Sequence, residues 1–284
     1  MNSIAIIGPT AVGKSSLGMK LAEKLGGEIV SIDSRQIYRG LDIGTAKASA
    51  EDQARIRHHC IDILEITEKS NARWFADQAL HAMENIKKEG KVPVLVGGSG
   101  LYLRAITQGL FDIDLDPSDR KAFEAGVEDS ATSELHSRLS SSDPESAGRI
   151  HENDRYRIIR ALEVLHLTGI TLSEHFRRQK EERSGDIVGL VRIGLDMDRD
   201  LLRERIAKRT GEMYDAGWPD EVSSLLEGGS DPSCPGLQTL GYPETISFVR
   251  GELDIADATE KIAMLTGQYA KRQMTWFRKE PEVK

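Results

Sequence analysis

Residues 8–15 have the sequence Gly-Pro-Thr-Ala-Val-Gly-Lys-Ser, a spacing that suits the binding of phosphate. Glycines allow such a loop to curl until its backbone N–H groups point at phosphate oxygens. Lys14 supplies a mobile positive charge for the outer phosphates, and Ser15 can place its hydroxyl on a phosphate-bound Mg²⁺. A glycine-rich turn without a ligand gives no reason for the Gly-Lys-Ser sequence. The spacing therefore predicts a phosphate site, and it leaves open whether the phosphate is transferred.

The residues on both sides of this loop predict the elements that position it. Residues 3–7 form a short apolar run, which indicates a buried parallel strand. Leu17, Leu21 and Leu25 recur at helical spacing after the loop. The loop is therefore expected at a helix N-terminus, where the helix dipole favours anions.

Asp33 ends the second apolar run, residues 28–33. A carboxylate in this place can act as a general base for the nucleophile that attacks a phosphorylated substrate. It can also be a turn or N-cap aspartate with a structural role. The third run, residues 92–97, is followed by Gly-Ser, where a P-loop enzyme that hydrolyses a nucleotide usually has an Asp for Mg²⁺.

Strands that alternate with helices predict an α/β fold, a P-loop NTPase-like parallel sheet flanked by helices. Between the second and third runs, residues 74–88 have the pattern of an amphipathic helix. Its apolar face is formed by Phe75, Ala79, Met83 and Ile86. Ligands of such sheets bind at the carboxyl ends of the strands. We therefore expect one crevice where three loops converge, namely residues 8–15, 33–39 and 97–102.

The pattern changes from about Leu110 onward. An acidic stretch at 112–117 and a second stretch at 182–186 are typical of linkers, and the residues between them are helical in pattern, with Ile159, Leu162 and Leu165 apolar in 156–166. Residues 187–195 resume a strand pattern. The sequence therefore predicts a core of residues 1–112 and 187–284 and a helical insertion domain of residues 113–186.

A terminal helix is predicted over residues 257–278. Its apolar stripe of Ile262, Leu265, Tyr269 and Trp276 is expected to pack into the core. Lys271, Arg272 and Arg278 would then remain outside.

Composition limits the possible partners. The net charge of −8 argues against a generic nucleic-acid binder, which usually carries a basic excess. Three local basic clusters run against this average: Arg155, Arg157 and Arg160; Arg177, Arg178 and Lys180; and Lys271, Arg272, Arg278 and Lys279.

Two cysteines exclude a disulfide scaffold and fit the cytoplasm. No apolar run approaches the roughly 20 residues of a membrane span, so no membrane partner is expected.

Eight segments, in order along nearly the whole chain, resemble one family. They are residues 8–15, 31–40, 42–47, 58–62, 96–102, 153–163, 240–242 and 271–278. The family is that of the bacterial tRNA dimethylallyltransferases, the isopentenyltransferases that modify adenosine 37. The Asp-Ser-x-Gln-x-Tyr and Lys-Arg-Gln-x-Thr-Trp elements are the most specific ones. This chain departs from the family at Ser99, where Thr is usual, and at Pro243, where a basic residue is frequent.

The resemblance implies that the loop holds the pyrophosphate of dimethylallyl diphosphate, with Mg²⁺ at Ser15. It implies catalytic roles for Asp33, Thr10 and Lys14, with Asp33 accepting the proton of the adenine N6 amino group. The implied diphosphate ligands are Gly8, Pro9, Thr10, Ala11, Val12, Gly13, Lys14, Ser15, Ser99, Arg157 and Arg160.

The resemblance also implies that the protein, expected to be a monomer, clasps the tRNA anticodon stem-loop. The reacting base must then swing out of the loop to reach the crevice. The segment from Asp33 to Gln36 is placed to contact that base. The implied tRNA-binding residues are Asp33, Ser34, Arg35, Gln36, Ser99, Arg120, Tyr156, Arg157, Ile158, Ile159, Arg160, Gln238, Gly241, Tyr242, Lys271, Arg272 and Arg278.

Three other functions stay open at the level of sequence. A small-molecule P-loop kinase would use the loop and Asp33, but it would leave the basic terminal helix without a role. A prenyltransferase that acts on free adenine nucleotide would not need the arginine-rich insertion. A non-catalytic RNA-binding protein would not need an intact Lys14, Ser15 and Asp33.

Overall fold

The computed structural model describes residues 2–109, 117–182, 189–280 and 283. It divides the chain into two compact units, one formed by Met1–Thr107 and Ile187–Lys284 and the other by Gln108–Asp186. The domain boundaries expected at 112–113 and 186–187, and most of both expected linkers, lie outside the described residues. The first unit contains the sheet, and the second is helical where it is described.

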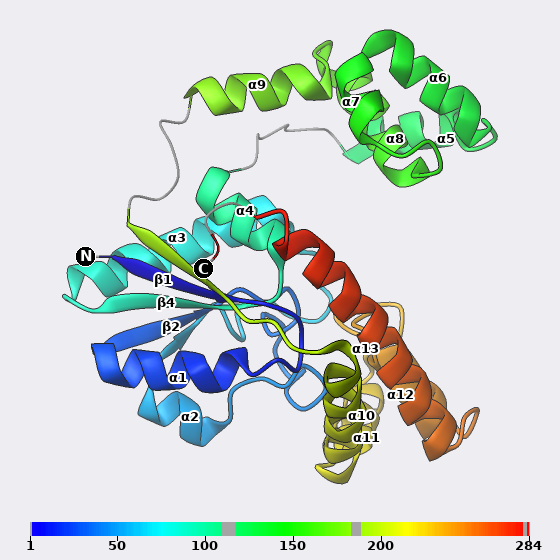
Figure 1. Cartoon of the computed structure of the whole chain (residues 1–284). Coiled ribbons are helices and arrows are strands. Elements are labelled where there is room, and N and C mark those ends of the chain that lie inside the picture. The colour runs from blue at the N-terminus through cyan, green and yellow to red at the C-terminus, as the bar shows by residue number, and fades with distance from the viewer. Residues whose placement is uncertain (1, 110–116, 183–188, 281–282, 284) are drawn as a thin grey trace. The chain divides into compact units, whose positions relative to one another are not determined.

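The sheet of the first unit is fully parallel and has the strand order β3-β2-β4-β1-β5, which confirms the predicted α/β class (Figure 1). The runs at 3–7 and 92–97 are strands as expected, the second strand ends two residues before Asp33, and the two-residue β3 was not predicted. The strands are β1 Ser3–Ile7, β2 Gly27–Ser31, β3 His58–His59, β4 Val92–Gly97 and β5 Leu190–Gly194.

Helices α1 and α3 cover opposite faces of the sheet, and α10 to α13 gather beyond the carboxyl ends of its strands (Figure 1). None of the described helices is long and apolar enough to cross a membrane. The helices of this unit are α1 Lys14–Leu25, α2 Ala50–Arg55, α3 Ala72–Lys88, α4 Gly100–Gln108, α10 Arg199–Asp215, α11 Trp218–Glu227, α12 Tyr242–Val249 and α13 Ile255–Phe277.

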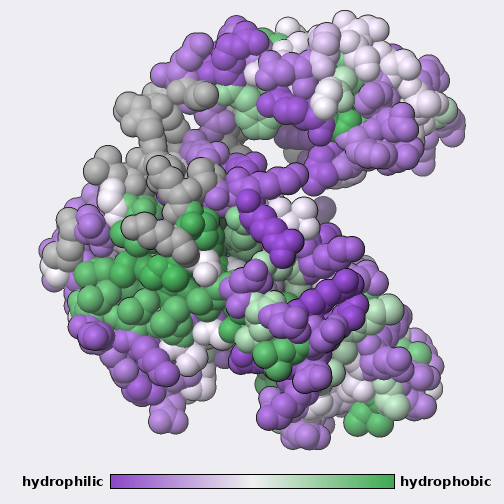
Figure 2. Space-filling model, viewed as in Figure 1, coloured by the Kyte–Doolittle hydropathy of each residue, from purple (hydrophilic) through white to green (hydrophobic). Residues whose placement is uncertain are grey.

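The core lies between these helices and the sheet. The predicted apolar face of α3 is confirmed, since Phe75, Ala79, Met83 and Ile86 are all buried. Hydrophobic residues also gather at the surface between α1 and β5 (Figure 2). There Ile4 of β1 is half-buried and its register partner Val191 of β5 is exposed, at the margin of the cluster packed under α1.

Helix α13 is rotated relative to the predicted stripe. Ile262 is buried as expected, but Leu265, Tyr269 and Trp276 are only half-buried. The buried face instead includes small residues such as Ala258 and Ala270. Small side chains allow the backbones of α13 and α10 to approach, and Ala270 packs against Leu202 and Ile206 of α10.

The second unit has its own core, formed mainly by α6 and α8. Leu135, Leu139, Ile158 and Leu162 are buried together there. The expected apolar positions Ile159 and Leu165 are half-buried, because Ile158 and Ala161 take the inner face. The helices are α5 Pro117–Gly126, α6 Thr132–Ser142, α7 Pro144–Arg149, α8 Arg155–Thr168 and α9 Leu172–Glu182.

Candidate active site

The loop of residues 8–15 has a backbone that glycine makes possible. Gly8 has φ 149°, and a Cβ at this position would lie 2.5 Å from the Leu195 carbonyl oxygen beyond β5. Gly13 has φ 106° and is the N-cap of α1, which begins at Lys14. The first-turn N–H groups of a helix have no partner within the helix. They are available to an anion at this end of α1.

A hollow of about 360 Å³ opens in front of this loop, and we call it the first hollow. All three loops that were expected to converge contribute to its wall. Among the lining residues are Lys14, Ser15, Asp33, Gln36, Gly97 and Arg209.

Lys14 presents its ammonium group to the first hollow. Its Nζ donates to the carbonyl oxygen of Pro9 at 2.6 Å. Burial lowers the pKa of Lys14 to about 8, with Asp33 acting against this shift and Arg209 adding to it. An anion bound in the hollow would raise this pKa again, because it favours the charged ammonium.

Thr10 is fixed by side chains from two distant helices. Its backbone N donates to Oε1 of Gln273 on α13 at 2.8 Å, and its Oγ1 accepts from Nη2 of Arg209 on α10 at 2.7 Å. Gln273 is buried and also donates to the carbonyl oxygen of Gly98 at 2.9 Å. Sequence reasoning missed both helix residues as parts of the site. Gln273 belongs to the specific Lys-Arg-Gln element, whereas Arg209 is one of many charges on α10.

A second hollow, also of about 360 Å³, adjoins the first. The two hollows share Thr10, Asp33, Thr45 and Arg209 as lining residues. Asp33 is half-buried on this common border, and its Oδ1 accepts from the backbone N of Arg35 at 2.8 Å. The turn therefore fixes the carboxylate between the two hollows.

Aromatic and basic side chains line the rest of the second hollow. Among them are Trp218, Tyr269 and Arg272. Burial, together with the charge of Asp33, raises the pKa of Tyr269 to about 12, so its hydroxyl stays protonated. The guanidinium of Arg272 lies 5.7 Å from the centre of the Tyr269 ring.

Several predicted tRNA-binding residues also lie at the second hollow or on the surface. Ser34, Arg35 and Gln238 line it, and Gln238 donates to the Pro232 carbonyl oxygen at 2.9 Å. Lys271 and Arg278 are exposed on and after the last turns of α13. These contacts with tRNA stay predictions.

Two predicted residues have structural roles instead. Tyr242 is fully buried, and its hydroxyl donates to Oε1 of Glu221 at 2.6 Å. Gly241 is buried as the N-cap of α12, where a Cβ would lie 2.3 Å from the Trp218 ring. Packing against α11 encloses the Tyr242 side chain and Gly241, so neither offers a surface to RNA, and their contact with tRNA stays a prediction.

Ser99 begins the turn that leads into α4. Its backbone N donates to the Ile32 carbonyl oxygen at 3.3 Å, and its carbonyl oxygen accepts from Leu103 at 3.0 Å. From this loop, Val96 and Gly97 line the first hollow. A contact between Ser99 and the diphosphate or tRNA stays a prediction.

In the second unit, α8 separates the predicted residues by face. Tyr156 is 73% exposed, whereas Ile158 is fully buried, so the Ile158 side chain offers no surface to RNA and its predicted contact stays a prediction. Arg157 is exposed and pairs with Asp154. The predicted contacts of Arg157 and Arg160 with the diphosphate stay predictions.

Glu163 was not expected from the sequence and is the centre of an ion-pair cluster on α8. This carboxylate is 1% exposed and lies 2.8 Å from Nη1 of Arg160 and 3.1 Å from Nε of Arg120. A hollow of about 480 Å³ is lined by these groups together with Tyr156 and Ile159. The predicted Arg120, Tyr156, Ile159 and Arg160 are therefore brought together.

Comparison with known sequences gives the same family along almost the whole chain. Residues 36–280 match the model of the IPP transferase family. A tRNA dimethylallyltransferase from Gloeobacter violaceus is 44% identical over 280 residues, which cover 99% of this chain and 90% of that protein. The tRNA dimethylallyltransferase 2 from Syntrophus aciditrophicus is 42% identical over 283 residues, with 99% and 90% covered.

Solved structures agree with the sequence matches. A full-length tRNA isopentenylpyrophosphate transferase from Bacillus halodurans superimposes with a TM-score of 0.71 at 39% identity, covering 99% of this chain and 88% of that one. A eukaryotic dimethylallyltransferase acting on tRNA gives a TM-score of 0.81 at 28% identity, covering 97% and 69%. The chain belongs to the IPP transferase family, whose members among these relatives are tRNA dimethylallyltransferases.

Proposed function

We propose that this protein transfers the dimethylallyl group of dimethylallyl diphosphate to N6 of adenosine 37 in a tRNA anticodon loop. The position of Asp33 carries this proposal. Its carboxylate borders both hollows, one of which is suited to phosphate and the other to an aromatic base. The family to which the chain belongs supports the same reaction.

The first hollow would bind the diphosphate. Backbone N–H groups at the start of α1, the Lys14 ammonium and the Arg209 guanidinium all lie at its wall. The pyrophosphate gains negative charge as its bond to carbon breaks. Donors and cations that are already in place stabilise this charge more strongly in the transition state than in the ground state, and this difference accelerates the reaction.

The same hollow fits a Mg²⁺ ion bound to the diphosphate. Mg²⁺ prefers oxygen ligands and usually combines one or two protein groups with phosphate oxygens and water. Ser15 supplies a hydroxyl in the first turn of α1, and it lines the hollow beside Lys14. When bound, Mg²⁺ would neutralise part of the charge on the leaving pyrophosphate.

The second hollow would bind the extruded adenine. Tyr269 offers a ring surface, and Arg272 adds a planar cation above it. Aromatic and guanidinium planes are the usual stacking partners of unstacked bases. Entry from this side would bring the adenine N6 amino group to Asp33.

The reaction then joins the contents of the two hollows. The bond between the allylic carbon and the bridging oxygen breaks, and its electron pair leaves with the pyrophosphate. The lone pair of N6 forms the new bond to that carbon. Asp33 accepts the proton that N6 loses, which restores a neutral amine. Thr10, held by Arg209 and Gln273, lies at the same border and can contact the diphosphate.

Basic side chains outside the hollows would contact RNA phosphates. Lys271 and Arg278 are exposed, so their charges are available to a bound stem-loop, and the exposed Arg157 would share its charge between Asp154 and a phosphate. Each phosphate contact releases counterions and makes binding sensitive to salt. We place this activity in the cytoplasm and assign it to the monomer.

The experiment that tests the proposal compares acceptors. An anticodon stem-loop with adenosine 37, free AMP and ATP are each incubated with labelled dimethylallyl diphosphate. We expect label in the stem-loop only. Label in AMP but not in RNA would show that the acceptor is a free adenine nucleotide. ATP consumption without any label would show that the protein is a kinase and not a prenyltransferase.

Asp33→Ala tests the assigned base. The variant should retain binding of pyrophosphate and stem-loop but lose about 10²–10⁴ in kcat, the usual contribution of a general base. Asp77→Ala, which removes an exposed carboxylate on α3, is the control. Transfer by Asp33→Ala at nearly the wild-type rate would refute the assignment.

A further inference from the structure

The segment of residues 41–48 connects both hollows but has no helix or strand of its own. Thr45 lines the two hollows, and Lys47 and Ala48 line the first. Ala46 has φ 50°, a left-handed conformation that a residue with a side chain rarely adopts. A segment with such a backbone keeps one shape only when surrounding contacts hold it.

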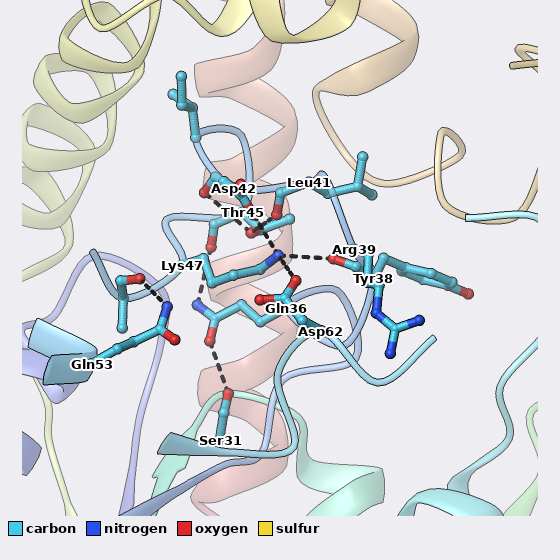
Figure 3. A network of polar contacts seen from close by, with 12 residues as sticks. Ser31, Gln36, Tyr38, Arg39, Leu41, Asp42, Thr45, Lys47, Gln53 and Asp62 are labelled. Carbon is cyan, nitrogen blue, oxygen red and sulfur yellow. Dashed lines mark hydrogen bonds and ion pairs between the residues drawn. The ribbon is translucent and has the colours of Figure 1, made fainter. Parts of the chain in front are cut away.

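Lys47 makes the most concentrated of these contacts (Figure 3). Its side chain is 2% exposed. Its Nζ donates to Oδ1 of Asp42 at 2.5 Å, to Oδ1 of Asp62 at 2.6 Å and to the Tyr38 carbonyl oxygen at 2.8 Å. An ammonium group has three hydrogens to donate, so all of them are used inside the protein.

This arrangement distinguishes Lys47 from Lys14, although both line the first hollow. Lys14 donates to one neutral carbonyl oxygen, and no carboxylate balances its charge by direct contact among the described residues. Lys47 lies between two carboxylates. To bind a diphosphate, the buried Lys47 ammonium would have to give up its contacts with both Asp42 and Asp62. The geometry therefore favours a role for Lys47 in holding the segment.

Two further side chains hold the same segment. Gln36 donates through Nε2 to the carbonyl oxygens of Thr45 and Ala46, both at 3.1 Å, and its Oε1 accepts from Ser31 Oγ at 2.8 Å (Figure 3). Both hydrogens of the Gln36 amide nitrogen are therefore donated to the segment. From α11, Oε2 of Glu221 accepts from the backbone N of Asp42 at 2.9 Å and of Ile43 at 2.7 Å.

We propose that Lys47 is a positioning residue, which acts on prenyl transfer by holding residues 41–48 as the common wall of the diphosphate and base hollows. The inference rests on the proposed function for its effect on the reaction. The contacts of Lys47 with Asp42 and Asp62 set the position of Thr45, and Thr45 in turn limits how the two reacting groups meet beside Asp33. A shift of about 1 Å in such a wall can cost about 10²-fold in rate.

The test compares Lys47→Met with Lys91→Met in the full-length protein. Lys91 is a matched control, because its Nζ also joins two carboxylates, Glu28 at 2.5 Å and Glu89 at 2.8 Å, away from both hollows. We expect Lys47→Met to lower kcat about 10- to 100-fold. The affinity for inorganic pyrophosphate should change less than about threefold, because Lys47 has no free donor for it. Lys91→Met should change neither quantity.

Hydrogen exchange gives a readout that does not depend on the reaction. The amides of Ala46 and Lys47 donate to Ile43 and Asp42, both at 3.0 Å. They should exchange faster in Lys47→Met than in the wild type, and they should not change in Lys91→Met. If the wild type transfers no prenyl group to RNA, the proposed function fails, and the exchange and pyrophosphate measurements still decide the inference.

A double variant separates positioning from stability. Lys47→Met leaves the partly exposed Asp62 carboxylate against an apolar side chain, and Asp62→Asn removes that charge. The double variant should therefore unfold at a higher temperature than Lys47→Met and still have the low kcat. If Lys47→Met does not fold, the double variant is used in its place in every measurement. A kcat within threefold of the wild type, or pyrophosphate binding weakened tenfold or more, would overturn the inference.

Discussion

The loop of residues 8–15 and helix α8 (Arg155–Thr168) were both predicted to bind phosphate, and they are built differently. In the loop, unusual backbone angles at Gly8 and Gly13 turn successive residues toward one hollow. In α8 the backbone is regular, so Tyr156 and Arg157 face outward while Ile158 lies in the core. A run of consecutive ligands is therefore reasonable for a loop. On a helix, neighbours in sequence point about 100° apart, and only one face can reach a ligand.

Helix α8 also pairs its charges more fully than the loop. Arg160 shares the buried Glu163 with Arg120, whereas Lys14 has a neutral partner. A cation that is already paired gains less from a phosphate than one that is not. A basic residue therefore predicts a phosphate ligand only when its partners in the fold leave its charge available.

The inner face of α8 gives the largest expected effect. Ile158→Ala should lower the free energy of unfolding by about 2–5 kcal/mol, because it leaves a cavity in the core of the second unit. Urea denaturation measures this loss, with the half-buried Ile159→Ala as the comparison. If Ile158→Ala bound RNA more weakly at full stability, Ile158 would contact RNA, and the difference between the inner and outer faces of α8 would be contradicted.

The loop is tested by Lys14→Met. The variant should lose about 10²–10³ in kcat/KM, the usual cost of one group that stabilises developing negative charge. Its affinity for pyrophosphate should fall as well, which calorimetry can measure. Lys20→Met, exposed on the same helix α1, serves as the control. Equal kinetics for the two variants would exclude the loop from the mechanism.

A pH series sharpens the role of Lys14. Because its pKa is lowered to about 8, the ammonium is charged below pH 8 and loses its proton above it. Pyrophosphate affinity should therefore be highest near pH 7, begin to fall as the pH rises toward 8, and fall by up to about tenfold per pH unit above it. Lys14→Arg keeps its charge, so its profile should stay flat over this range. A falling profile in Lys14→Arg would assign the titration to another group.

The outer face of α8 gives the smallest expected effect. Arg157→Ala should reduce the slope of log K against log salt for stem-loop binding by about 1, the contribution of one phosphate contact. Tyr156→Ala removes stacking surface but no charge, so it should weaken binding without changing the slope. Binding by both variants can be followed by fluorescence anisotropy between 50 and 200 mM salt. An unchanged slope for Arg157→Ala would show that this face does not bind phosphate.

Local patterns predicted much of the fold. Continuous apolar runs located β1 and β4, because a parallel strand is buried on both faces, and helical periodicity located α3 and α8, because burial of one face imposes a repeat. The two residues of β3 are too few to show a repeat, and the stripe on α13 shifted because small residues pack against α10. Loop position and residue type also predicted that Lys14, Ser15 and Asp33 share a hollow.

The rest of the site depends on packing between distant segments. In the sequence, nothing distinguishes Arg209 from the other arginines of α10, and only the fold shows its hydrogen bond to Oγ1 of Thr10. Gln36 was expected to contact the base, and its hydrogen bonds to Thr45 and Ala46 could be seen only in three dimensions. The burial of Tyr242 likewise follows from α11 and could not be derived from a Gly-Tyr pair.

The hydrogen bond from Thr10 to Gln273 joins residues that are 263 positions apart. A site closed by such a contact is a late product of synthesis. During translation the first loop and its strand emerge long before α13, so the candidate site stays incomplete in the growing chain until that helix packs against α10. The entropic cost of so long a closure grows only with the logarithm of its length. The hydrogen bond that fixes the Thr10 backbone can therefore form only after α13 has been made.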